Sequence, residues 1–234
     1  MKLRRRRLTG MSAIAALLII GILQLSVFWQ SRSSTPFERP QSVQQPTGVA
    51  ADALATLPVK GRAPKTDYSR SQFGDGWLRA NGCDTRNIIL HRDLSESVVA
   101  ADCKVMSGLL NDPYTGSQIR FLRGATTSDK VQIDHVVALS DAWQKGAQQL
   151  TKERRIELAN DPLELLAVDG PANQAKSDGD AATWLPEYKP FRCQYVARQI
   201  AVKQKYKLWV TQAERDVMAD VLRLCPGQLL PKGL

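Results

Sequence analysis

The sequence of 234 residues lacks any Cys-x-x-Cys pair and contains only two histidines and four cysteines. A structural zinc site needs four thiolate or imidazole ligands, usually in closely spaced pairs, so zinc binding is the less favoured role for these cysteines. The sequence also has no internal repeat and no helix-turn-helix or zinc-finger array, which weighs against repeat proteins and against modules that read a DNA sequence.

Positive charge is concentrated at the N-terminus. The net charge is +9, but Lys60–Leu234 contain 25 Lys and Arg against 21 Asp and Glu. The basic residues Lys2 and Arg4–Arg7 precede an apolar run, Met11–Trp29, and this is the arrangement of an export signal. A run of about 19 residues just spans a bilayer core as a helix. Its exit is a poor cleavage site, so we expect a membrane anchor, with a cleaved signal peptide as the alternative.

The composition changes again after the apolar run. Residues 30–59 are rich in Ser, Gln, Pro and Ala, which is typical of a flexible linker. We therefore divide the chain into a basic region with its membrane anchor (1–29), an extracytoplasmic linker (30–59) and a folded domain (60–234). Because an exported domain folds in an oxidising compartment, its even number of cysteines predicts two disulfides.

Hydrophobic periodicity and turn residues predict a mixture of strands and helices. Tyr68, Phe73, Trp77 and Leu78 recur at helical spacing, and Asp112–Gly116 has the composition of a turn. The predicted strands are Ile88–Leu90, Ser117–Arg123, Val131–Leu139 and Leu163–Val168. The predicted helices are Asp141–Gly146, Thr151–Ala159, one that starts near Ala172, Cys193–Trp209, and one that opens with the capping box Thr211–Glu214.

The last two helices suggest how the cysteines pair. Cys193 begins one helix and Cys225 ends the next, and these two ends lie side by side in an antiparallel hairpin. This geometry predicts a Cys193–Cys225 disulfide, which leaves Cys83 and Cys103 to form the second.

Asp134 and His135 are neighbours in a strand that is otherwise built for burial. Adjacent residues of a regular strand point to opposite faces. The two side chains can therefore act on one substrate only where the strand ends or bulges. The alternative is a solvated aspartate beside a histidine at the edge of the core.

Downstream of Asp134 and His135 the expected order is strand, strand, helix, which resembles the ββα-metal nuclease motif. More closely, the chain resembles the secreted actinobacterial branch of the HNH endonuclease family, which is related to the C-terminal domain of GmrSD-type restriction enzymes. The resemblance covers roughly Tyr68 to Cys225. It is specific because several short stretches match together and in the same order along the chain. The matching stretches are Gly82–Asn87, Asp112–Gly116, Ile133–Leu139, Asp141–Trp143, Asn160–Leu163, Asn173–Lys176 and Asp180–Pro186.

The resemblance implies an α+β fold with a ββα-metal core, wrapped by helices and stapled by the two disulfides. It implies an endonuclease that hydrolyses DNA without sequence specificity, with RNA as a second candidate substrate. His135 would be the general base. Asp134 and Asn173 would supply oxygen ligands to Mg²⁺ or Mn²⁺. Lys176, one turn after Asn173, would contact phosphate, or else it is an ordinary surface lysine.

One position departs from the family pattern. Relatives usually carry an asparagine where this chain has Glu164. A carboxylate there can accept a ring N–H of the catalytic histidine and raise its pKa, or it can add negative charge beside the metal and weaken the enzyme. On the preceding strand, Arg120 and Arg123 flank Phe121 and are candidates for lining a nucleic-acid groove.

Two other functions stay open at this point. One is a membrane-tethered protein that binds nucleic acid with weak catalysis or none. Glu164 supports this alternative, because it replaces the asparagine of the family pattern. A structural or adhesion module of the cell envelope can carry Asp134 and His135 incidentally. The expected partners are nucleic acid and, through residues 11–29, the membrane; the sequence indicates no protein partner.

Overall fold

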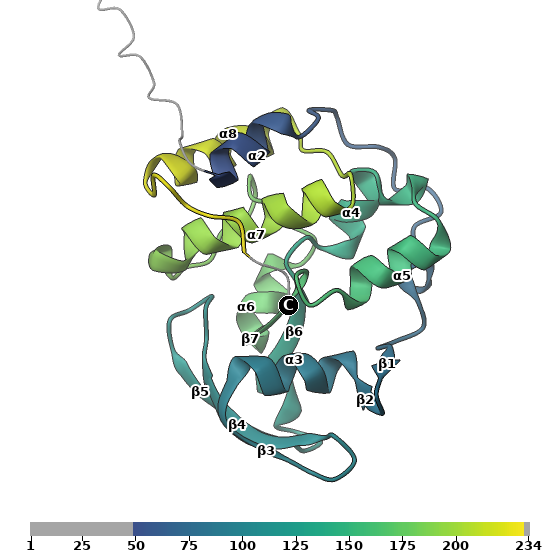
Figure 1. Cartoon of the computed structure of the whole chain (residues 1–234), viewed down its shortest axis with the longest axis vertical. Coiled ribbons are helices and arrows are strands. Elements are labelled where there is room, and N and C mark those ends of the chain that lie inside the picture. Colours follow the sequence, from purple (N-terminus) through teal and green to yellow (C-terminus); the bar gives the residue numbers. More distant parts are fainter. Residues whose placement is uncertain (1–48, 232–234) are drawn as a thin grey trace, which may run out of the picture. The chain divides into compact units, whose positions relative to one another are not determined.

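The computed structural model describes residues 49–231, and they form the mixed α+β fold that the sequence predicts (Figure 1). The helices are α2 (Val49–Thr56), α3 (Thr85–Asp93), α4 (Leu139–Gln144), α5 (Lys152–Asn160), α6 (Gly170–Lys176), α7 (Arg192–Lys205) and α8 (Gln212–Arg223). Short 3₁₀ helices are η1 (Arg70–Phe73), η2 (Ser128–Lys130), η3 (Ala147–Gln149) and η4 (Lys189–Phe191). The strands are β1 (Arg79–Ala80), β2 (Cys83–Asp84), β3 (Leu94–Val99), β4 (Val105–Asn111), β5 (Gln118–Leu122), β6 (Val131–His135) and β7 (Leu165–Asp169).

The folded part begins before Lys60, so the predicted C-terminal boundary of the linker, residues 30–59, was wrong. Its last residues form α2, which buries Ala50 and Leu54 and packs against α7 and α8. Alanine is both a common linker residue and the strongest helix former, and its small side chain lets helices approach closely. Composition alone therefore did not distinguish this helix from a linker.

The predicted membrane anchor, residues 11–29, lies outside the described residues. Within residues 49–231, no helix is long and apolar enough to cross a bilayer. The anchor stays a prediction.

Helices α2, α7 and α8 gather on one side of the molecule (Figure 1). The capping box that opens α8 is present as predicted, because Thr211 accepts from the Glu214 backbone N–H and Glu214 accepts from that of Thr211. Tyr195, Ile200 and Met218 of α7 and α8 are fully buried and belong to the larger hydrophobic core. The helical hairpin brings its two ends together, as the disulfide prediction required.

Both predicted disulfides are present. The Cα atoms of Cys193 and Cys225 are 6.4 Å apart, and this bridge joins the start of α7 to the end of α8. The Cα atoms of Cys83 and Cys103 are 5.3 Å apart. The described residues contain no free cysteine.

The opposite side of the molecule is a three-stranded antiparallel sheet, β3-β4-β5, that packs with α3 (Figure 1). The prediction of a strand at Ile88–Leu90 was wrong, because these residues lie in α3. The Asp84 carboxylate accepts from the Asn87 backbone N–H at 2.8 Å and caps this helix. The N-cap outweighs the β-branched residues, and Ile89 and Leu90 are fully buried against the sheet.

Strands β6 and β7 pair antiparallel in the middle of the molecule, and α6 follows β7 directly (Figure 1). The Asp169 side chain caps α6 by accepting from the Ala172 backbone N–H at 2.8 Å. Gly170 makes the sharp entry into α6 possible, since a Cβ there would lie 2.1 Å from the Asp129 carbonyl oxygen. The predicted order of strand, strand and helix is therefore present, and it carries Asp134, His135 and Asn173.

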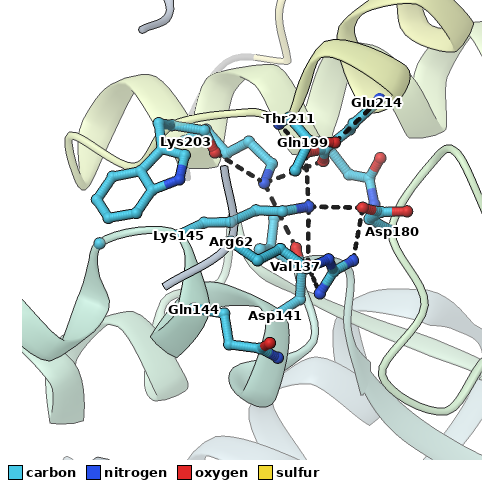
Figure 2. A network of polar contacts seen from close by, with 12 residues as sticks. Arg62, Val137, Asp141, Gln144, Lys145, Asp180, Gln199, Lys203, Thr211 and Glu214 are labelled. Atoms are coloured by element: carbon cyan, nitrogen blue, oxygen red, sulfur yellow. Dashed lines mark hydrogen bonds and ion pairs between the residues drawn. The ribbon is translucent and has the colours of Figure 1, made fainter. Parts of the chain in front are cut away.

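A buried network of charges lies between α4, α7 and α8 (Figure 2). The Lys145 ammonium lies 2.8 Å from Asp141, 2.7 Å from Asp180 and 2.6 Å from Glu214. Lys203 and the partly exposed Arg62 complete the set, so three cations face three carboxylates. Burial alone would lower the pKa of Lys203, but Glu214 and Asp141 outweigh it and raise that pKa. The network fixes α4, which starts four residues after His135.

Candidate functional site

Asp134 and His135 lie at the end of β6, and a strand end is one of the two places where adjacent side chains can act on one substrate. The strand ends at His135, which pairs with Leu165 of β7. Both side chains line one hollow of about 400 Å³, the main hollow, together with Asn173 from α6. A smaller hollow of about 160 Å³, the side hollow, is lined by Trp77 and Ala159 and shares His135 with the first. The end of the strand thus lets two adjacent side chains reach one cavity.

The His135 imidazole is held in one orientation. Its Nε2 lies 2.9 Å from the backbone oxygen of Ala159, at the end of α5, and its ring stacks on that of Trp77 with 5.8 Å between centroids. A carbonyl oxygen only accepts, so Nε2 carries the proton and Nδ1 keeps its lone pair. The Ala159 carbonyl therefore sets the tautomer that a general base needs.

Burial controls the charge of the ring. It lowers the pKa of the His135 imidazole to about 3, although the hydrogen bond to Ala159 acts in the opposite direction. The positive charges of Arg70 and Lys176 lower this pKa further. The imidazole is consequently neutral at physiological pH.

Asp134 is buried between two donors. Lys176 Nζ lies 2.9 Å from Asp134 Oδ1 and 2.8 Å from the backbone oxygen of His135. The hydroxyl of Tyr114 donates to Asp134 Oδ2. Burial raises the pKa of the Asp134 carboxyl, and Lys176 and Tyr114 oppose that rise. Tyr114 lies in the turn Asp112–Gly116. The composition of this segment predicted the turn but not the hydrogen bond from Tyr114 to Asp134.

Asn173 projects from α6 into the main hollow. Its Nδ2 donates to Gln132 Oε1 at 2.9 Å, which fixes the amide plane. No N–H or O–H group within the described part of the chain donates a hydrogen bond to Asn173 Oδ1. This side chain therefore offers a neutral oxygen to a ligand in the hollow.

The structure corrects the expectation for Glu164. Its carboxylate oxygens each lie 3.2 Å from the Val137 backbone nitrogen, and its backbone oxygen accepts from Val136 N–H at 2.9 Å. It does not bond the imidazole, because the carbonyl of Ala159 occupies that position. Burial raises the pKa of Glu164 well above its usual value, although the bond from Val137 lowers it. Glu164 thus fixes the chain just after His135 rather than the ring itself.

Comparison with known proteins places the chain in a family. Residues 87–221 match the family described as GmrSD restriction endonucleases, C-terminal domain. This chain belongs to that family. The sequence is also 35% identical over 196 residues to an uncharacterized secreted protein from Arthroderma benhamiae, which covers 82% of this chain and 93% of that protein. No solved structure matches the chain. The predicted relationship to GmrSD enzymes is confirmed, whereas membership of the HNH family and of its actinobacterial branch stays a prediction.

The match to the GmrSD C-terminal domain family includes Asp134, His135 and Asn173 but not the residues before Asn87. Arg70 and Trp77, which line the hollows, come from that earlier part of the chain. Neither residue was predicted from the sequence to lie in the site. Helical spacing drew attention to Trp77, but no local pattern marked Arg70.

The three predicted phosphate contacts do not line the main hollow. Lys176 is 2% exposed, and its ammonium is paired with Asp134. Arg123 donates to the backbone oxygen of Val105 at 2.7 Å and to Asn87 Oδ1 at 2.5 Å, so it ties α3 to the sheet. Arg120 is exposed on β5 and lines neither hollow.

The main hollow offers hard oxygen donors to a cation. Residues 49–231 contain no group of three or more His, Cys, Asp or Glu side chains that could hold a metal ion. Asp134 and Asn173 nevertheless present a carboxylate and an amide oxygen to the same cavity. Each Asp134 oxygen accepts one hydrogen bond and keeps a second lone pair. This sparse set of oxygen donors fits an ion such as Mg²⁺, which retains most of its water ligands.

Proposed function

We propose that this protein is an exported, divalent-metal-dependent endonuclease that hydrolyses the phosphodiester bonds of DNA, and that β6, β7 and α6 are its ββα-metal core. The observation that carries the proposal is the shared cavity of His135, Asp134 and Asn173, in which the imidazole is neutral and its tautomer is fixed. Membership of the GmrSD C-terminal domain family supports the same activity. The 234-residue sequence shows no helix-turn-helix or zinc-finger pattern, so we propose cleavage with little sequence specificity.

His135 acts as the general base in this proposal. Its Nδ1 takes a proton from a water molecule, whose oxygen forms a bond to phosphorus while the bond from phosphorus to the 3′ oxygen breaks. The 3′ oxygen then takes a proton from solvent, so one water is consumed for each bond cleaved. The negative charge of a bound phosphate raises the pKa of the imidazole from its low value and improves it as a base.

Asp134 and Asn173 would hold the cation, Mg²⁺ or Mn²⁺. Bound there, such an ion supplies positive charge for the phosphorane and the leaving oxygen. Tyr114 and Lys176 keep the Asp134 carboxylate in place for this role. Because the Lys176 charge already compensates Asp134, we expect weak metal binding.

Export rests on independent observations. The basic residues 2–7 followed by the apolar run 11–29 have the pattern of an export signal. Two disulfides suit an oxidising compartment outside the cytoplasm. The similar protein from Arthroderma benhamiae is described as secreted. We propose that residues 11–29 anchor the domain at the outer face of the membrane, and intact mass measurement of the mature protein distinguishes this from cleavage.

Nicking of supercoiled plasmid with Mg²⁺ or with chelator tests the proposed activity. We expect cleavage only with the metal, and His135→Ala should lower the rate by about 10²–10⁴-fold. His91→Ala is the matched control, because His91 is the other histidine and is exposed on α3. Retention of DNA without any product would instead favour capture of nucleic acid without hydrolysis. Equal rates for His135→Ala and wild type would refute the assigned base.

A further inference from the structure

Arg70 lies at the boundary between the two hollows. It lines both of them, together with His135 and Leu139. Its side chain is exposed, and no acceptor among residues 49–231 bonds its guanidinium. An arginine that faces a cavity without a partner is available to an anionic ligand.

The other charges around the main hollow are already compensated. Asp134 is paired with Lys176, and Lys65 lies 3.2 Å from Asp178. Among the charged residues that line this cavity, Arg70 is therefore the one without an ion-pair partner in residues 49–231. The charge acts at the imidazole itself, since Arg70 is among the groups that lower the pKa of His135.

The backbone on both sides of Arg70 is fixed. Phe73 is buried and packs edge-on against Trp143, whose Nε1 donates to the backbone oxygen of Thr66 at 3.2 Å. Arg155 of α5 donates to the backbone oxygen of Gln72 at 3.0 Å. An anchored backbone limits the conformational freedom that Arg70 loses when it binds a ligand.

The segment that carries Arg70, residues 60–84, precedes the part of the chain that matches the GmrSD C-terminal domain family. It also supplies Trp77, whose ring lies against His135 at an interplanar angle of 8°. One wall of the site is thus built from residues outside the matched domain.

We infer that Arg70 binds the phosphate on which His135 acts, so that the segment 60–84 completes the nucleic-acid site. A planar guanidinium offers two parallel N–H donors to two phosphate oxygens. The inference rests on the proposed function for the identity of the substrate, but it concerns binding and is testable without cleavage.

The test measures binding of a fluorescently labelled DNA duplex by anisotropy in the full chain with His135→Ala, over a range of salt concentrations. Adding Arg70→Gln should weaken binding by about 10-fold and reduce the slope of log K against log salt by about 1. Arg70→Lys should bind DNA more tightly than Arg70→Gln but less tightly than the Arg70 protein, because lysine restores the positive charge but not the two parallel N–H donors. Arg79→Gln is the matched control, since Arg79 is exposed in the same segment and lines neither hollow.

Unchanged affinity and salt slope in Arg70→Gln would overturn the inference, as would equal losses in Arg70→Gln and Arg79→Gln. The plasmid assay reports on hydrolysis separately. Binding that depends on Arg70 in a protein that cuts no DNA would therefore support this inference while the proposed nuclease activity failed.

Discussion

The ammonium of Lys176 lies 2.9 Å from Asp134 Oδ1, and both side chains are almost completely buried. A lysine on the last turn of α6 thus neutralises a carboxylate that faces the main hollow. The pair makes Lys176 a determinant of how strongly Asp134 attracts a cation, and it excludes the expected role as a surface contact to phosphate.

Lys176→Met should lower the free energy of unfolding by about 3–5 kcal/mol, because it leaves a buried carboxylate without its cation. Addition of Mg²⁺ should restore part of that loss, and the Mg²⁺ concentration for half-maximal rate should fall below that of wild type. Thermal unfolding with and without Mg²⁺ checks both effects. A variant whose melting temperature responds to Mg²⁺ no more than that of wild type would contradict this account of Lys176.

Asn173→Ala should raise the Mg²⁺ concentration for half-maximal cleavage, since it removes one of two oxygen donors from a sparse site. Asn111→Ala, on the exposed end of β4, is the matched control and should leave the metal dependence unchanged. The measurement is the initial rate as a function of Mg²⁺ concentration. Identical curves for Asn173→Ala and wild type would remove Asn173 from the metal site.

The low pKa of His135 predicts how stability depends on pH. In the unfolded chain the imidazole titrates near its usual 6.5, whereas in the folded protein its pKa is about 3. Between these values the unfolded state binds the proton more readily, so this contribution to stability is complete above pH 6.5 and is lost as the pH falls toward 3. The loss at pH 5 should be about 2 kcal/mol.

His135→Gln removes that titration, so its free energy of unfolding should change less than that of wild type between pH 7 and pH 5. Urea denaturation at the two pH values provides the comparison, and His91→Gln should behave as wild type does. Equal pH dependence in wild type and His135→Gln would show that burial does not exclude the charged ring.

Glu164→Gln should leave the pH–rate profile superimposable on that of wild type, because Glu164 bonds Val137 N–H and not the imidazole. Burial raises the pKa of the Glu164 carboxyl, so its contribution to stability is complete below its usual pKa and is lost as the pH rises through the raised value. The Gln variant keeps an acceptor for Val137 and should be less sensitive to rising pH. A shift of the pH–rate profile in Glu164→Gln would reinstate coupling between Glu164 and His135.

Lys145→Met tests the buried network. The substitution leaves Asp141, Asp180 and Glu214 with fewer cations and should cost about 3–5 kcal/mol in the free energy of unfolding. Lys152→Met, at an exposed position on α5, should cost less than about 0.5 kcal/mol. Chemical denaturation of the two variants makes the comparison, and similar losses would mean that the network contributes little.

Features that depend on residues close together in the chain were predictable from the sequence. Thr151 and the Thr211–Glu214 box cap their helices through contacts within one turn, and both were predicted. Cys193 and Cys225 stand at the two ends of a helical hairpin, so their pairing followed from helix boundaries. The adjacent Asp134 and His135, with the motifs around them, were sufficient to predict the relationship to GmrSD enzymes.

Contacts between groups far apart in the chain depend on how the elements pack together. The imidazole of His135 bonds a carbonyl 24 residues away, and Lys176 reaches Asp134 across 42 residues. Arg70 lines the cavity, and Phe73, three residues later, is buried in the core. No periodicity or composition encodes such contacts, since they depend on how whole elements pack and on which polar groups burial forces to pair. Glu164, which was expected to bond the His135 imidazole, therefore accepts from the Val137 backbone N–H instead. Lys176, which was expected at the surface, is buried against Asp134.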